Sequence, residues 1–362
     1  MSSPAAFGGY DDWPDHAGRT PHLPGQFGAL FGIPTPPDVV VGGAPEGGGV
    51  RSREVHVRDG VRAVRLRWSV GFGPDLAAWL LHPVDADPAT RPGVLALHSH
   101  GGIKSLGAER MVDLPGVPAH VLAYREQAEE GAAVASDLAR SGFTVLAPDA
   151  FGWGARRFDL GVGDPQAYDA AAREHEHLVA KACALFDTSW AGMVAHDDLT
   201  SLAVLRTLCA PGPVGVLGFS GGGGRAALLA ALDDGIASVV VVAMMCTLAS
   251  LYPDHVGHSW LLHTRGLASG PDLVGLLATN PARHVLVGYC ARDRLFPLQG
   301  QRDADAALHQ AFAAGPGSYT PVWADTDHVF TRALQRDATE HLHATLPPTI
   351  SRTMDSTEER NP

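Results

Sequence analysis

The sequence lacks the features of several common classes of protein. Its 362 residues include only four cysteines and no CxxC pair, which argues against a zinc knuckle or a dense disulfide framework. Lys and Arg number 27 against 39 Asp and Glu, a net charge of -12, and no basic cluster suggests a nucleic-acid partner. No apolar run reaches the roughly 18 to 20 residues of a membrane span, and no secretory signal opens the chain. We therefore expect a cytoplasmic protein without a membrane partner.

Cofactor motifs are absent as well. The sequence has no Walker A stretch, and the glycines after Ser220 are not followed by the acidic residue with which dinucleotide-binding folds hold ribose. Two histidine-rich segments, 175–177 and 255–263, lack the HExxH spacing of zinc hydrolases. We expect no cofactor and no metal ion, and interpret these histidines as part of the rim of a pocket.

What the chain does contain is an alternation of short apolar runs with longer helical stretches. Residues 1–50, rich in Pro and Gly, are interpreted as an irregular arm, and residues 349–362 as a polar tail. One α/β domain remains over residues 51–348. It opens with two β-rich runs between Val55 and Pro83, which we interpret as antiparallel strands.

Six further apolar runs have the length of strands: 93–98, 143–149, 214–219, 237–244, 284–289 and 319–324. Five stretches are predicted to be helical: 119–141, 190–209, 222–233, 300–313 and 329–345. Continuously apolar strands are typical of parallel sheets covered on both faces, so we predict a doubly wound, mostly parallel sheet. Two segments, 150–189 and 245–283, are too long for plain crossovers. They are predicted to form lids over the carboxyl ends of the strands, where such sheets bind ligands.

The stretch VGVLGFSGGGGRAA, residues 214–227, places one serine between an apolar run and four glycines. Within it, residues 218–222 fit the pattern Gly-x-Ser-x-Gly, between a predicted strand and a predicted helix. This is the context of a nucleophile elbow, a strained turn that exposes the hydroxyl of Ser220. The alternative is a glycine-rich turn with a capping serine.

A serine hydroxyl becomes a good nucleophile only beside a histidine base that a carboxylate orients. In folds with such an elbow the chain order is Ser, acid, His. Asp293 and His328 directly follow the last two predicted strands, so we expect both at the same edge of the sheet as Ser220. Asp325 and Asp327 are rival acids, of which Asp327 is the main one.

The negative charge of a tetrahedral intermediate needs hydrogen-bond donors, and backbone N–H groups serve because they are preorganised. One donor is expected from Gly221, which follows the serine. The other is expected from the loop after residues 93–98, with Gly102 favoured over Ile103. We expect His98 and His100 to brace this loop. Three side chains are also predicted to contact substrate: His100, Trp153 and Trp260.

The chain resembles α/β-hydrolases, and more narrowly the dienelactone hydrolase and acetyl xylan esterase-like branch. The resemblance is carried by LHSHGG at 97–102, SWAGMVAHDDLTSLAVLRTL at 189–208, GVLGFSGGGGRAA at 215–227, CARDRLFP at 290–297 and DHVF at 327–330. It implies a serine esterase with Ser220 as nucleophile, Asp293 as acid and His328 as base. The chain departs from dienelactone hydrolases proper, which use cysteine as nucleophile, and from secreted xylan-directed relatives, which carry export signals.

The sequence therefore predicts a serine hydrolase of the carboxylesterase type. It would act through an acyl-enzyme on a small-molecule ester, such as an acetyl or other short-chain ester. The same triad could serve an amidase, a peptidase or an acyltransferase, and a C–C or dehydrating reaction is also open. A non-catalytic binding module is the alternative from a different class.

Overall fold

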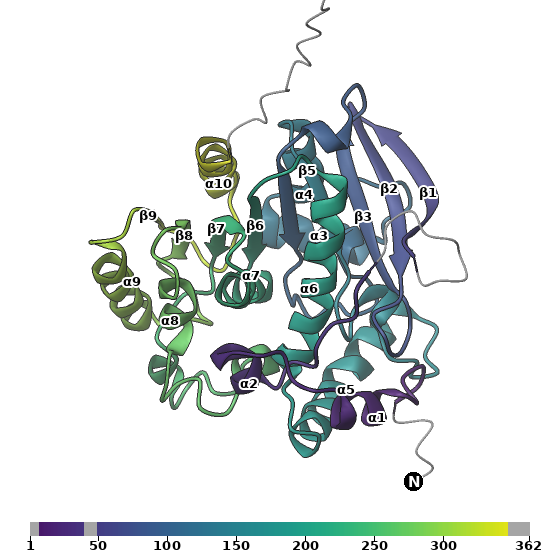
Figure 1. Cartoon of the computed structure of the whole chain (residues 1–362), viewed down its shortest axis with the longest axis horizontal. Helices are drawn as coiled ribbons and strands as arrows, with labels where there is room; N and C mark the ends of the chain where they lie inside the picture. The colour runs from purple at the N-terminus through teal and green to yellow at the C-terminus, as the bar shows by residue number, and fades with distance from the viewer. Residues whose placement is uncertain (1–6, 40–48, 347–362) are drawn as a thin grey trace, which may run out of the picture.

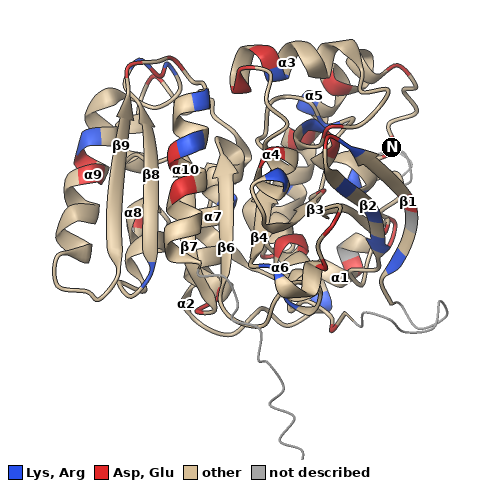
Figure 2. Cartoon of the chain, turned by 90° about the horizontal axis from the view of Figure 1, so that it is seen from above, with Lys and Arg blue, Asp and Glu red and all other residues tan. Residues whose placement is uncertain are grey.

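Six strands without a single Asp, Glu, Lys or Arg form the centre and one side of the sheet. In the computed structural model, which describes residues 7–39 and 49–346, they run parallel to one another. They are β4 (Gly93–Leu97), β5 (Thr144–Pro148), β6 (Val214–Phe219), β7 (Ile236–Val242), β8 (His284–Cys290) and β9 (Ser318–Ala324). Figure 2 shows β4, β6, β7, β8 and β9 free of charged residues. Their apolar side chains can therefore face helices on both sides of the sheet.

Three antiparallel strands extend the sheet to nine strands in the order β1-β2-β3-β5-β4-β6-β7-β8-β9. They are β1 (Arg51–Arg58), β2 (Val61–Trp68) and β3 (Leu76–Pro83). Arginines lie between apolar residues along β2 (Figure 2), whose buried positions recur every second residue on either side of a break at Val64 and Arg65. The predicted architecture of a mostly parallel sheet with leading antiparallel strands is confirmed.

Helices cover both faces of the sheet, and a buried apolar cluster lies on each face (Figure 1). One face carries α6 (Trp190–Leu208), α7 (Gly221–Leu232), α8 (Asp272–Ala278) and α9 (Leu298–Phe312). The other carries the end of α3 (Ala119–Glu129), α4 (Val134–Arg140) and α10 (Arg332–Thr345). The stretch 119–141 was expected to be one helix. It is two, because Glu130 and Gly131 adopt positive φ angles of 48° and 74° and end α3.

The N-terminal arm differs from the irregular segment that its composition predicts. It contains two short helices, α1 (Trp13–Arg19) and α2 (Gln26–Phe31). Its large apolar side chains, including Tyr10, Trp13, Phe31 and Ile33, are almost completely buried in the domain. In Figure 1 the arm runs below α6 and beside α5 (Pro165–Leu185). Burial of these side chains stabilises helices that are too short to persist alone.

Both long segments contribute residues to one pocket with Ser220, at the carboxyl end of β6, as expected of lids. The segment 150–189 contains α5, a 21-residue helix that the sequence analysis did not identify; the side chain of Asp164 caps its first turn by accepting a hydrogen bond from the N–H of Ala167. The segment 245–283 contains two 3-10 turns, η6 (Leu248–Leu251) and η7 (Trp260–Leu262), followed by α8. Helix α5 contacts η7, so the two insertions meet.

Helices α5 and α6 meet at a bend of 88°. Ser189 makes this corner, because its hydroxyl accepts from the N–H of Gly192 and donates to the carbonyl oxygen of Phe31 in the arm. Over residues 7–39 and 49–346, no single helix is long and apolar enough to cross a membrane. The bent pair α5 and α6 meets that criterion only when the two are taken together.

Candidate active site

Ser220 lies at the sharp turn between β6 and α7, with φ 54° and ψ -126°. This backbone conformation is strained for a residue with a side chain. Two neighbouring glycines permit the turn. A Cβ on Gly218 would lie 2.0 Å from the carbonyl oxygen of Gly222, and a Cβ on Gly222 would lie 2.1 Å from the carbonyl oxygen of Leu97 in β4. The helix can therefore approach the strands only if both positions are glycine, which is the geometry of a nucleophile elbow.

Ser220, His328 and Asp293 form a continuous chain of hydrogen bonds. The Nε2 atom of His328 lies 2.8 Å from the Oγ of Ser220, and its Nδ1 atom lies 2.6 Å from the Oδ2 of Asp293. A carboxylate can only accept, so Nδ1 carries the imidazole proton and Nε2 accepts from the serine hydroxyl. The side chain of Asp293 is 1% exposed, and its other oxygen accepts from the N–H of Leu295. This arrangement can remove the proton of the serine hydroxyl.

The two rival acids face away from this chain. Both Asp325 and Asp327 pair with the guanidinium of Arg292, and their side chains are 82% and 65% exposed. The carboxylate that contacts His328 is that of Asp293.

The backbone nitrogens of Gly221 and His100 lie near each other beside Ser220. The N–H of Gly221 begins α7 and therefore has no acceptor within the helix. A Cβ on Gly221 would lie 2.9 Å from the backbone nitrogen of His100, so the two nitrogens are close neighbours. Among the hydrogen bonds of the described residues, neither N–H has an acceptor. The N–H of Gly102 instead donates to Nδ1 of His100 at 3.2 Å. The candidate second donor is therefore His100, in place of Gly102, which the sequence analysis favoured.

Side chains of Arg110 and Trp153 bind the backbone around His100. Its carbonyl oxygen accepts from Nη1 of Arg110 and from Nε1 of Trp153, both at 3.3 Å. Arg110 also donates to the carbonyl oxygen of Ser99 at 2.5 Å. Trp153 is only 1% exposed and lies beneath this loop, so the prediction that it contacts substrate is wrong. It supports the loop instead.

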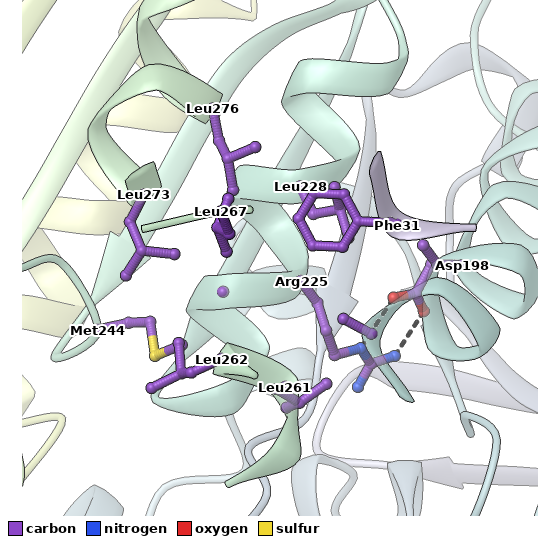
Figure 3. A pocket seen from close by; sticks show the side chains of 13 residues that line it. Phe31, Asp198, Arg225, Leu228, Met244, Leu261, Leu262, Leu267, Leu273 and Leu276 are labelled. Atoms are coloured by element: carbon purple, nitrogen blue, oxygen red, sulfur yellow. Dashed lines mark hydrogen bonds and ion pairs between the residues drawn. The ribbon is translucent and has the colours of Figure 1, made fainter. Parts of the chain in front are cut away.

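A buried ion pair anchors the start of the same loop. Arg225 of α7 binds both carboxylate oxygens of Asp198 on α6, at 2.6 and 2.9 Å, and donates to the carbonyl oxygen of His98 at 3.1 Å. Figure 3 shows this pair beside a group of leucines, Phe31 and Met244, which enclose a cavity of about 20 Å³. That volume admits little more than one water molecule, so it is no substrate site.

A much larger cavity, of about 1080 Å³, opens over Ser220. Its wall comes from the loop after β4, from α3 and α5, from the segment 245–283 and from the loops that carry Asp293 and His328. His100 and Trp260 line it, and so do four other histidines: His177, His255, His258 and His328. The indole N–H of Trp260 donates to Nδ1 of His177 at 2.8 Å and joins the two insertions across the cavity. The described residues contain no group of three His, Cys, Asp or Glu side chains placed to hold a metal ion.

The sequence analysis missed two charged residues at this site, Lys104 and Glu176. Glu176 belongs to the segment REHEHL, in which the sequence analysis considered only the histidines. The signal was its position, because it lies four residues after Ala172 and three before Val179, on the buried face of α5. A charged residue on the buried face of an amphipathic helix indicates a partner in the interior.

No protein-family model matches the chain, and neither does any curated protein. Solved structures do. A candidate acetyl xylan esterase from Bacteroides fragilis aligns with a TM-score of 0.60 and 16% identity, over 81% of this chain and 77% of that chain. Acetyl xylan esterases from a Paenibacillus and a Thermoanaerobacterium species each align with a TM-score of 0.52 and 15% identity. The first alignment covers 92% of this chain and 99% of the other, and the second covers 94% and 97%. Together with the sheet order and the elbow, these similarities show that the chain has the α/β-hydrolase fold.

Proposed function

We propose that this protein is a serine-dependent carboxylic ester hydrolase that acts on a small-molecule ester through an acyl-enzyme. The observation that carries the proposal is the hydrogen-bonded chain of Ser220, His328 and Asp293 beside a cavity of about 1080 Å³. A capping serine would need neither the histidine nor the buried carboxylate, and a binding module would need no strained turn at the serine.

The proposed reaction begins when Nε2 of His328 takes the proton of Ser220 while Oγ attacks the carbonyl carbon of the ester. The carbonyl oxygen becomes an oxyanion, which accepts hydrogen bonds from the N–H groups of Gly221 and His100. When this intermediate collapses, the C–O bond to the alcohol breaks and His328 gives its proton to the leaving oxygen. Water then attacks the acyl-enzyme, again with His328 as base, and releases the carboxylic acid.

We further propose a short acyl group, such as acetyl, on a polar alcohol. The cavity wall is rich in polar groups, among them Arg173, Asp254 and His258, with Trp260 as an aromatic surface. Such a wall suits a polar alcohol better than a long alkyl chain. The acetyl xylan esterases with the same fold are consistent with this choice.

The proposal is tested with a fluorophosphonate probe followed by peptide mass spectrometry, on the wild type and on the variants S220A, H328A and H309A. His309 is an exposed control on α9, and its side chain is 59% accessible. We expect labelling at Ser220 in the wild type and in H309A, no labelling in S220A and much slower labelling in H328A. Hydrolysis of p-nitrophenyl acetate should fall about 10⁴- to 10⁶-fold in S220A and H328A, and p-nitrophenyl decanoate should react more slowly than the acetate. A folded wild type that resists the probe, or an S220A variant with full turnover, would contradict the proposal.

A further inference from the structure

Three titratable side chains meet where the loop that follows β4 packs against α5. The Oε2 atom of Glu176 lies 2.7 Å from Nζ of Lys104 and 2.8 Å from Nε2 of His100. Lys104 and Glu176 are only 2% and 4% exposed. The reaction proposed above uses neither of them, although Glu176 borders the cavity over Ser220.

The position of Lys104 is fixed on several sides. Its ammonium nitrogen lies 3.7 Å from the ring centroid of Trp153 and 4.4 Å from that of Trp190, so two aromatic faces surround the charge. Burial lowers the pKa of Lys104, and the carboxylate of Glu176 opposes that shift. Burial alone would raise the pKa of Glu176, but the charge of Lys104 and the hydrogen bond from His100 bring it well below its usual value. Glu176 is therefore ionised.

An ionised Glu176 determines the state of His100. A carboxylate only accepts, so Nε2 of His100 carries the ring proton and Nδ1 is free to accept from the N–H of Gly102. The ring is thus held at both nitrogens, once from α5 and once from its own loop. Burial also lowers the pKa of His100, which keeps the ring neutral.

The backbone of His100 is held as firmly as its ring. Arg110 and Trp153 bind its carbonyl oxygen, as described above. Its remaining polar group is the N–H, which lies beside Gly221 where the oxyanion would form. The peptide that carries this N–H is held at both ends: the carbonyl oxygen of Ser99 accepts from Arg110, and the anchored ring fixes the Cα of His100.

We infer that Glu176, held in place by Lys104, is a positioning residue that fixes His100 so that its backbone N–H can stabilise the oxyanion. The inference rests on the proposed ester hydrolysis. Stability is a poor alternative explanation, because a buried ion pair contributes little compared with apolar side chains of similar size. A hydrogen bond to an oxyanion, in contrast, gains much from preorganisation.

The test compares two double variants that remove both charges and differ only in the acceptor offered to His100. K104M/E176Q keeps an amide oxygen near Nε2 of His100, whereas K104M/E176L offers none. We expect K104M/E176Q to keep kcat within about 3-fold of the wild type. In K104M/E176L, kcat should fall about 10- to 100-fold while KM changes by less than about 3-fold, since removal of a whole oxyanion donor costs about 10²- to 10³-fold. The inhibition constant of a trifluoromethyl ketone, which forms an oxyanion with the serine, should rise in parallel.

Equal kcat values in the two double variants would overturn the inference, and so would a fall in K104M/E176L without weaker inhibition by the ketone. If K104M/E176L does not fold, E176D serves in its place, because it keeps a negative charge to balance Lys104 while the shorter side chain draws the shared oxygen back from His100. E176D should then show the same loss of kcat and of ketone affinity, and unchanged values would overturn the inference. E340Q, an exposed charge change on α10, is the control. Comparison of the wild type with S220A in the same assay distinguishes failure of this inference from failure of the proposed function. A wild type no faster than S220A would refute the proposed function itself.

Discussion

Alanine at Gly222 should destabilise the protein, whereas alanine at Gly224 should leave its stability nearly unchanged. A Cβ on Gly222 would lie 2.1 Å from the carbonyl oxygen of Leu97 and 3.0 Å from that of His98. Both are backbone atoms, and Leu97 is paired with Gly218 in the centre of the sheet, so neither can move without displacing β4. Gly224 is different, because a Cβ there would first meet the terminal methyl of Met244 at 2.5 Å.

The expected magnitudes follow from these contacts. Overpacking against backbone costs about 3 kcal/mol, at the upper end of the usual range, and Ala gains about 1 kcal/mol over Gly within a helix. G222A should therefore lose about 2 kcal/mol of unfolding free energy. In G224A the Met244 side chain can turn aside, since both residues line the small cavity of about 20 Å³ in Figure 3. We expect G224A to lie within about 1 kcal/mol of the wild type.

Urea unfolding at pH 7 measures the unfolding free energy of both variants, and hydrolysis of p-nitrophenyl acetate measures their kcat. G222A should also lose about 10-fold or more in kcat, because a shift of 1 Å near reacting groups costs up to about 10²-fold. Its methyl group would push the start of the loop that carries His100. If G222A proved as stable as G224A, the argument from close approach of α7 and β4 would be refuted.

Two further predictions concern the orienting acid and the dependence of stability on pH. D293N should lower kcat about 10³- to 10⁴-fold, because an amide can hold the imidazole of His328 in the wrong tautomer. D325N, at an exposed aspartate, should keep kcat within about 2-fold. Similar losses of kcat in both variants would contradict the assignment of Asp293 as the acid. Burial lowers the pKa of His16 in α1 from 6.5 to about 4, so the folded state binds this proton less readily than the unfolded state. The contribution of neutral His16 is therefore fully present above pH 6.5 and is lost as the pH falls toward 4. Because the ring is partly exposed, the slope should stay below about 1 kcal/mol per pH unit. H16L should lose less stability than the wild type between pH 7 and pH 4.5 in urea unfolding, and parallel losses would contradict the prediction.

The features of the fold and of the candidate site that could be predicted from the sequence depend on local patterns of residues. Uniformly apolar runs identify the parallel strands because both of their faces are buried. The elbow and the order Ser220, Asp293, His328 follow from the positions of these residues directly after strands. The choice of Asp293 over Asp327 could also be made in advance, because a neighbour of His328 in the chain is badly placed to bind its Nδ1.

The parts that could not be predicted depend on tertiary contacts. The second oxyanion donor was assigned to Gly102 because glycine exposes its backbone, but the direction of each N–H is set by how the loop folds, and there His100 faces Gly221. The helices of the arm have seven and six residues, and only burial of Trp13 and Phe31 stabilises them. No local pattern relates Lys104 to Glu176, since the sheet and α5 bring them together across a long stretch of chain.

The docked N-terminal arm has a consequence for the order in which the chain folds during synthesis. The hydroxyl of Tyr10 donates to the carbonyl oxygen of Arg156, 146 residues later, and the carbonyl oxygen of Phe31 accepts from Ser189, 158 residues later. Ribosomes add about 5 to 20 residues per second, so the arm emerges roughly 7 to 30 s before its partners. We expect its aromatic side chains to remain exposed during that interval and to be available to chaperones. A segment that is made well before its partners is then among the last to reach its native place.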